Sequence, residues 1–113
     1  MEIQTPVARD ELDLCLHAWE KAIDEWQEAQ MEAAEEEGMF KAWESATKAA
    51  IMATKVSAVM AEAQVRANPH WRERYLRYQK LSIVAETKKR ILRLAEAKWE
   101  SERSRQVSLR NLR

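Results

Sequence analysis

The chain has one Gly and two Pro in 113 residues, and this shortage of turn-forming residues is the strongest constraint on its fold. Hairpin turns, phosphate-binding loops and nucleotide-binding fingerprints need several residues at positive φ or in close backbone approach, which Gly permits. The composition therefore argues against such loop-based sites and predicts an all-α protein of long helices. The length predicts one domain over residues 1–113, with flexible ends at 1–9 and 104–113.

Two places interrupt the helical pattern, Gly38 and Asn68-Pro69. They divide the chain into three predicted helices, from about Asp10 to Glu37, from Met39 to Ala67 and from Pro69 to Gln106. Asn68 is a favourable N-cap and Pro69 a favourable first residue for the third helix. Gly38 leaves two alternatives open, since it either ends the first helix or bends a longer one.

The first predicted helix carries apolar residues at alternating spacings of four and three, the heptad pattern of a coiled coil. The frame contains Leu12, Leu16, Trp19, Ile23, Trp26, Gln30 and Ala33, and it is widened by Cys15, Ala22 and Ala29. We expect the two Trp rings to pack in a core rather than to hold a cofactor. The second predicted helix is rich in Ala, which allows close approach by neighbouring helices and predicts a central position.

The third predicted helix has a second heptad frame. Its apolar members are Trp71, Tyr78, Leu81, Ala85, Leu92, Ala95 and Trp99, and Arg74 and Lys88 fill the remaining slots. At about 1.5 Å per residue this helix is longer than a compact domain of this size, so part of it is expected to project or to pair with another subunit. The expected fold is thus a helical hairpin plus a long C-terminal helix with coiled-coil-like packing, in a homo-oligomer. The predicted oligomer interface is Leu12, Leu16, Trp19, Ile23, Trp26, Leu81, Leu92 and Trp99.

The net charge of zero hides a division along the chain. Residues 1–62 hold 14 acidic and 5 basic side chains, whereas residues 63–113 hold 5 acidic and 14 basic ones. The two halves could pair within one molecule or between copies, or the basic half could bind a polyanion.

Catalytic and metal chemistry find little support in the sequence. A single Cys excludes an internal disulfide, and the two His residues lack ligand spacing with Cys or with each other, so no metal site and no cofactor are expected. Cys15 and His17 are two residues apart on a helix and point away from one another, which argues against a nucleophile pair. These features together predict a non-enzymatic protein. Neither a signal peptide nor a membrane span is recognisable, so we also expect a cytoplasmic protein without membrane contact.

Basic and aromatic residues alternate along the third predicted helix, a combination typical of single-stranded nucleic-acid binding. The predicted nucleic-acid-binding residues are Lys88, Lys89, Arg90, Arg93, Lys98, Arg103, Arg105, Arg74, Arg77 and Tyr78. The alternative is that the rings form a core while the cations are solvated or pair with the acidic first helix. No helix-turn-helix, finger or RNP signature is present, so nothing predicts sequence-specific readout.

The order of parts resembles the UvsY-type recombination mediators of T-even phages. The matching parts are Trp19 and Trp26, the Gly38 break, the Ala-rich stretch K-A-W-E-S-A-T-K-A-A-I-M-A-T-K-V-S, the Asn68-Pro69 break and the terminal W-E-S-E-R-S-R. The resemblance covers most of the chain and concerns its layout, without a diagnostic motif. It departs before the Gly break, where the family has a basic stretch with paired Tyr and this chain has Glu32, Glu35, Glu36 and Glu37.

The resemblance implies a ring-like homo-oligomer that binds single-stranded DNA and helps to load a RecA-type recombinase onto strands covered by single-strand-binding protein. It also implies the host-cell cytoplasm as the location of a phage-encoded protein. Because of the acidic departure, we expect DNA to contact the third helix at Lys88, Lys89, Arg90 and Arg93. The alternative function is a helical protein–protein interaction module, such as a phage inhibitor or assembly adaptor, without DNA binding.

Overall fold

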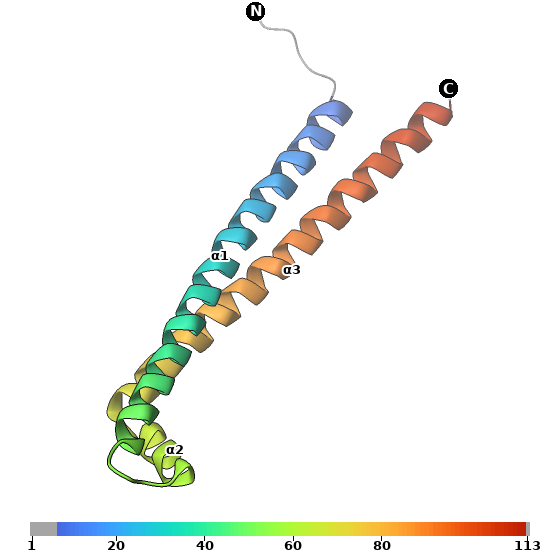
Figure 1. Ribbon diagram of the computed structural model, residues 1–113. Coiled ribbons are helices and arrows are strands. Elements are labelled where there is room, and N and C mark those ends of the chain that lie inside the picture. The colour runs from blue at the N-terminus through green and yellow to red at the C-terminus, as the bar shows by residue number, and fades with distance from the viewer. Residues whose placement is uncertain (1–6, 113) are drawn as a thin grey trace, which may run out of the picture. The chain divides into compact units, whose positions relative to one another are not determined.

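The computed structural model describes residues 7–112, and over this range the chain is helical apart from short connections. The helices are α1 (Val7–Met52), α2 (Ala58–Ala67) and α3 (Pro69–Asn111) (Figure 1). The predicted all-α class with three helices is confirmed, and no strand occurs in the described part. Of the ends predicted to be flexible, residues 1–6 and 113 lie outside the described residues, whereas 7–9 and 104–111 are helical.

The helices form two compact units, which are described separately. Unit 1 contains residues 7–28 of α1 and residues 86–112, which include the second part of α3. Its two helical segments run antiparallel, because partner numbers in α3 fall as numbers in α1 rise. Glu11 pairs with Arg105, and Glu25 pairs with Lys88.

Unit 2 contains residues 29–85, which comprise the end of α1, all of α2 and the start of α3. Its buried side chains are Ala29, Ala33, Phe40, Ala61 and Val65. Ala61 and Val65 are four residues apart and therefore lie on one face of α2. That face is buried, which makes this short helix part of the core of unit 2.

Gly38 lies inside α1 and neither ends nor caps it, so the predicted first helix and the first part of the predicted second one form a single helix. The site is exposed and has no positive φ, and apart from its chain neighbours and the backbone of the adjacent helical turns no atom of the described residues lies within 4 Å of the place where a Cβ would be. Lys41 pairs with Glu37 at 2.7 Å across the glycine. This i, i+4 pair supports the helix at its weakest residue and raises the pKa of Lys41.

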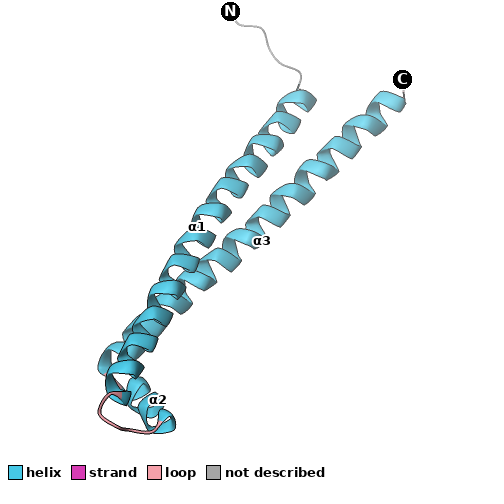
Figure 2. Ribbon diagram, viewed as in Figure 1, coloured by secondary structure: helices cyan, strands magenta, loops and turns pink. Residues whose placement is uncertain are grey.

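A helix break that no Gly or Pro marks in the sequence lies at residues 53–57, between α1 and α2, and is drawn as a loop in Figure 2. The Thr54 hydroxyl donates to the carbonyl of Ile51 at 2.6 Å, and Lys55 has a left-handed φ of 66°. Ser57 then caps α2 by accepting from the amide of Met60 at 3.2 Å. Local side-chain bonds of this kind compete with helix continuation, so α2 begins only at Ala58.

The connection between α2 and α3 is the one that the sequence predicts. The Asn68 side chain accepts from the amide of His70 at 2.9 Å, and Pro69 is the first residue of α3. Such an N-cap satisfies an amide that has no partner inside the helix. The third helix reaches Asn111, five residues beyond its predicted end.

The predicted heptad frame of α3 is confirmed by its burial pattern, because all nine of its members are half-buried. The frame of α1 needs a correction. Leu16 and Gln30 are exposed, whereas Ala22 and Ala29 are buried and Cys15 is half-buried. The other frame residues and the three widening residues keep the predicted face, so the correction concerns only Leu16 and Gln30. The small side chains of Ala22 and Ala29 allow close helix approach there.

Candidate nucleic-acid interface

Four predicted DNA-binding residues of α3 are free of side-chain partners within residues 7–112. These are Lys89, Arg90, Arg93 and Lys98, all in unit 1. Arg90, Arg93 and Lys98 are exposed, and Lys89 is half-buried. Spacings of three and four residues separate Arg93 from Arg90 and Lys89, so these three cations share one side of the helix.

Two predicted contact residues of unit 1 pair with acidic side chains of α1. Lys88 Nζ lies 3.4 Å from a carboxylate oxygen of Glu25, and Arg105 lies 3.0 Å from Glu11. Arg105 also donates to Glu102, and this interaction raises the pKa of Arg105 and lowers the pKa of Glu102. The basic segment is therefore partly neutralised within unit 1.

Three predicted contact residues stack on or contact aromatic rings. The Arg103 guanidinium lies 5.6 Å from the centre of the Trp99 ring in unit 1. In unit 2, Arg74 lies 5.3 Å from the Trp43 ring, and Tyr78 stacks on Phe40 at 5.8 Å. The Arg pairs have cation–π geometry, which fixes the guanidinium orientation.

The remaining predicted contact residue, Arg77, is exposed in unit 2 and lies 3.8 Å from Glu36. An exposed pair at this distance contributes little to stability, so the Arg77 guanidinium can exchange its partner at low cost. Its acidic neighbour nevertheless lowers the local positive potential.

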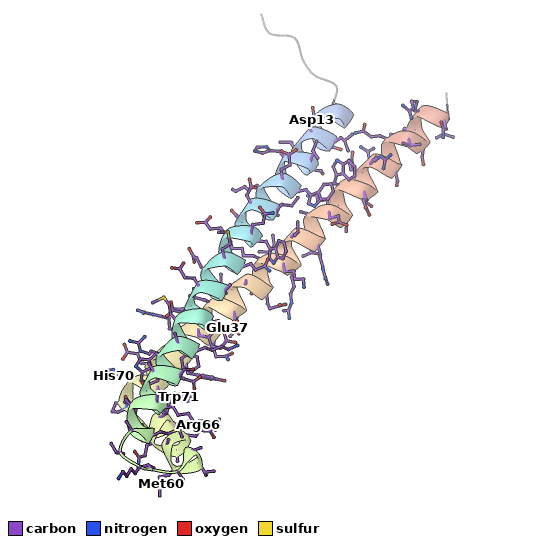
Figure 3. All side chains as sticks on the ribbon, viewed as in Figure 1. Asp13, Glu37, Met60, Arg66, His70 and Trp71 are labelled. Atoms are coloured by element: carbon purple, nitrogen blue, oxygen red, sulfur yellow. The ribbon has the colours of Figure 1, made fainter. Side chains whose placement is uncertain are left out.

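The aromatic residues near the start of α3 form a cluster in unit 2. Phe40 contacts the rings of Trp71, Tyr75 and Tyr78 at centroid distances of 6.0, 5.9 and 5.8 Å. Trp71 and Tyr75 stack at 4.9 Å, and Trp71, labelled in Figure 3, donates its indole N–H to Glu44 at 2.8 Å. These rings hold unit 2 together and already contact one another. Phe40 had no place in the predicted site, although it lies one heptad after Ala33 and so continues the α1 frame once the helix is seen to pass Gly38.

The predicted oligomer residues divide by exposure. Leu16 is exposed, whereas the other seven are half-buried. Trp19 and Trp99 contact each other within unit 1, with ring centroids 5.1 Å apart. Both rings are therefore used inside a single copy, and their role between copies stays a prediction.

Within residues 7–112 no group of three or more His, Cys, Asp or Glu side chains is placed to hold a metal ion. A search of the same residues finds no helix long and apolar enough to cross a membrane. No protein-family model, curated protein or solved structure matches this chain.

Proposed function

We propose that the chain is a non-enzymatic single-stranded-DNA-binding recombination mediator that helps to load a RecA-type recombinase. One observation supports this most directly: Lys89, Arg90 and Arg93 present three cations on one side of α3 with no acidic partner in the described part of the chain. Cations that have no protein partner can neutralise phosphates, and the release of counterions from the strand then favours binding.

The proposed contact is with the sugar–phosphate backbone. The aromatic cluster of unit 2 is engaged in ring–ring contacts, so base stacking contributes less than charge. Three cations make a weak site, and a homo-oligomer would strengthen it by avidity. The layout shared with UvsY-type mediators supports the recombinase and the single-strand-binding protein as partners, in the cytoplasm of the host cell.

A protein–protein interaction module without DNA affinity is the second candidate, and a separate observation favours it. Glu25 pairs with Lys88, and Glu11 pairs with Arg105, so the acidic α1 already meets part of the basic α3 inside unit 1. If such pairing accounts for the whole charge division, no cations are left over for DNA. The two candidates therefore differ in whether Lys89, Arg90 and Arg93 bind a strand.

The test is fluorescence anisotropy of a labelled oligo-dT strand at several salt concentrations, with the full chain and two triple variants. Lys89→Ala/Arg90→Ala/Arg93→Ala removes the proposed contacts. Lys21→Ala/Arg66→Ala/Arg72→Ala removes the same charge from exposed sites elsewhere and serves as the control. Far-UV circular dichroism checks that each variant is helical.

Binding by the wild type should weaken steeply with salt. The first variant should reduce the slope of log affinity against log salt by about 2, since each lost phosphate contact contributes roughly 0.7 on single strands. Equal slopes for the two variants would exclude the α3 site, and no binding at low salt would favour the interaction module. Strand exchange by a RecA-type recombinase on strands coated with single-strand-binding protein then tests mediation itself, and no acceleration by the wild type would reject that role.

A further inference from the structure

Unit 1 is a pair of helical segments without a closed core. Ala22 is its one buried side chain among residues 11–28 and 86–112. Trp19, Trp26, Leu92 and Trp99 all remain partly exposed. Two helices cannot enclose an apolar interior between them, and helical domains generally cover it with further helices. Unit 1 therefore has enough large apolar side chains for a core, but no further helix shields them from solvent.

The uncovered apolar surface is a groove of about 460 Å³ lined by both helical segments. Its most exposed side chains are Leu14, Ile91 and Leu94, at 67%, 44% and 71% of full exposure. Ala18 also lines the groove, and Lys98 adds a positive charge. A contiguous apolar patch with a charged neighbour is typical of a protein-binding surface.

We propose that a second copy of this chain covers the groove, so that two unit 1 surfaces close a four-helix core. Charge complementarity favours this occupant. Apart from the Glu25–Lys88 and Glu11–Arg105 pairs inside one copy, residues 11–28 carry four acidic side chains and one Lys, whereas residues 86–112 carry six basic and four acidic ones. An isologous contact that places α1 of each copy on α3 of the partner brings opposite charges together twice, whereas α1 on α1 would repel.

This interface differs from the one that the heptad frames predict. Trp19 and Trp99 of that prediction contact each other inside one copy, whereas Leu14, Ile91 and Leu94 lie outside both frames and are exposed. The inference goes beyond the proposed function and does not depend on it, because self-association is measured without DNA.

The experiment is sedimentation equilibrium of the full chain over a wide range of concentrations. The wild type should form a dimer or a multiple of it, and Leu94→Glu should weaken association by about 100-fold, since a buried unpaired carboxylate is costly. The matched control is Leu76→Glu, because Leu76 is an exposed Leu on α3 outside the groove. Circular dichroism of both variants at the same concentrations confirms their helicity.

A second measurement needs no variant. Cys15 lines the groove and is the single Cys of the chain, so its reaction with a thiol reagent reports on this surface alone. The reaction should slow as concentration rises through the association range. A monomer at every concentration overturns the proposal, as does a dimer that is insensitive to Leu94→Glu or leaves Cys15 equally reactive. Oligo-dT binding by a monomeric Leu94→Glu chain would leave the DNA proposal standing, so the two can fail separately.

Discussion

The indole rings of Trp19 and Trp99 lie 5.1 Å apart between centroids with an angle of 33° between their planes. They join α1 to α3 at the middle of unit 1. The indole nitrogen of Trp19 is buried and has no hydrogen-bond partner among residues 7–112. An unpaired buried donor costs about 1–3 kcal/mol, so this contact combines a favourable ring pair with an unfavourable polar group.

Because only Trp19 of this ring pair has an unpaired buried donor, replacing each Trp with Phe should change the free energy of unfolding by different amounts. Trp99→Phe should lower the free energy of unfolding by about 1 kcal/mol, because it shrinks the ring contact. Trp19→Phe loses similar contact but also removes the buried donor, so its net effect should be within about 0.5 kcal/mol of zero. Urea denaturation followed by far-UV circular dichroism measures both, and equal losses would show that the donor carries no cost.

Gly38→Ala should stabilise the chain. The glycine is exposed inside α1 and has free space where a Cβ would be, so alanine gains helix propensity of about 0.5–1 kcal/mol without strain. Ala42→Gly, one turn later and also exposed, is the reciprocal control and should lose a similar amount. Thermal unfolding of the two variants gives the comparison. A loss of stability in Gly38→Ala would indicate that a bend at this residue is required.

Lys55→Gly should also stabilise the chain, for the opposite reason. Lys55 has a φ of 66°, where a Cβ is unfavourable by about 1–2 kcal/mol. Glycine removes that strain but adds flexibility to the unfolded state, so the expected net gain in unfolding free energy is about 0.5–1 kcal/mol. Thr54→Gly, next to it without a positive φ, should be destabilising. Chemical denaturation tests both, and a loss in Lys55→Gly would contradict the left-handed loop.

The hydrogen bond between Trp71 and Glu44 predicts a measurable coupling in unit 2. Its distance is 2.8 Å and both groups are partly buried. A double-mutant cycle with Trp71→Phe and Glu44→Ala, measured by chemical denaturation, should give a coupling free energy of about 1–2 kcal/mol, since one partner is charged. Tyr75→Phe with Glu44→Ala is the control cycle and should give almost none. Comparable couplings in both cycles would mean that general packing, and not this bond, is being measured.

The pair between Lys48 and Glu62 predicts a pH effect at the surface of unit 2. The Lys48 ammonium donates to Glu62 at 2.9 Å and lowers the pKa of that carboxyl. A lowered folded-state pKa means that the stabilisation exists above the ordinary Glu pKa and disappears as pH falls through the folded value. Titration by nuclear magnetic resonance should show a Glu62 midpoint below that of free Glu. Lys48→Met should raise it, and an unchanged midpoint would exclude the pair in solution.

The candidate site could be predicted only in part. Positive charge on α3 is visible in the sequence, but whether a cation is free depends on what lies across from it. Lys88 and Lys89 are adjacent in sequence, yet Lys88 reaches Glu25 and Lys89 has no described partner. Tyr78 stacks on Phe40. Such differences depend on which side of α3 faces the neighbouring helix and on which side chains lie opposite, and the composition alone does not reveal either.

The sequence by itself determined the helical class, the start of α3 at Asn68-Pro69 and the half-buried face of α3, because each depends on local capping or on one helix's own periodicity. Only the tertiary structure decided that α1 continues through Gly38, that Leu16 and Gln30 fall outside its contact face, and that the helix is interrupted at residues 53–57. Each of these outcomes depends on a small difference in free energy. Examples are the helix propensity lost at one glycine, the packing of one alanine and the single hydrogen bond of the Thr54 hydroxyl. Packing of the neighbouring helix and competing local hydrogen bonds decide such balances.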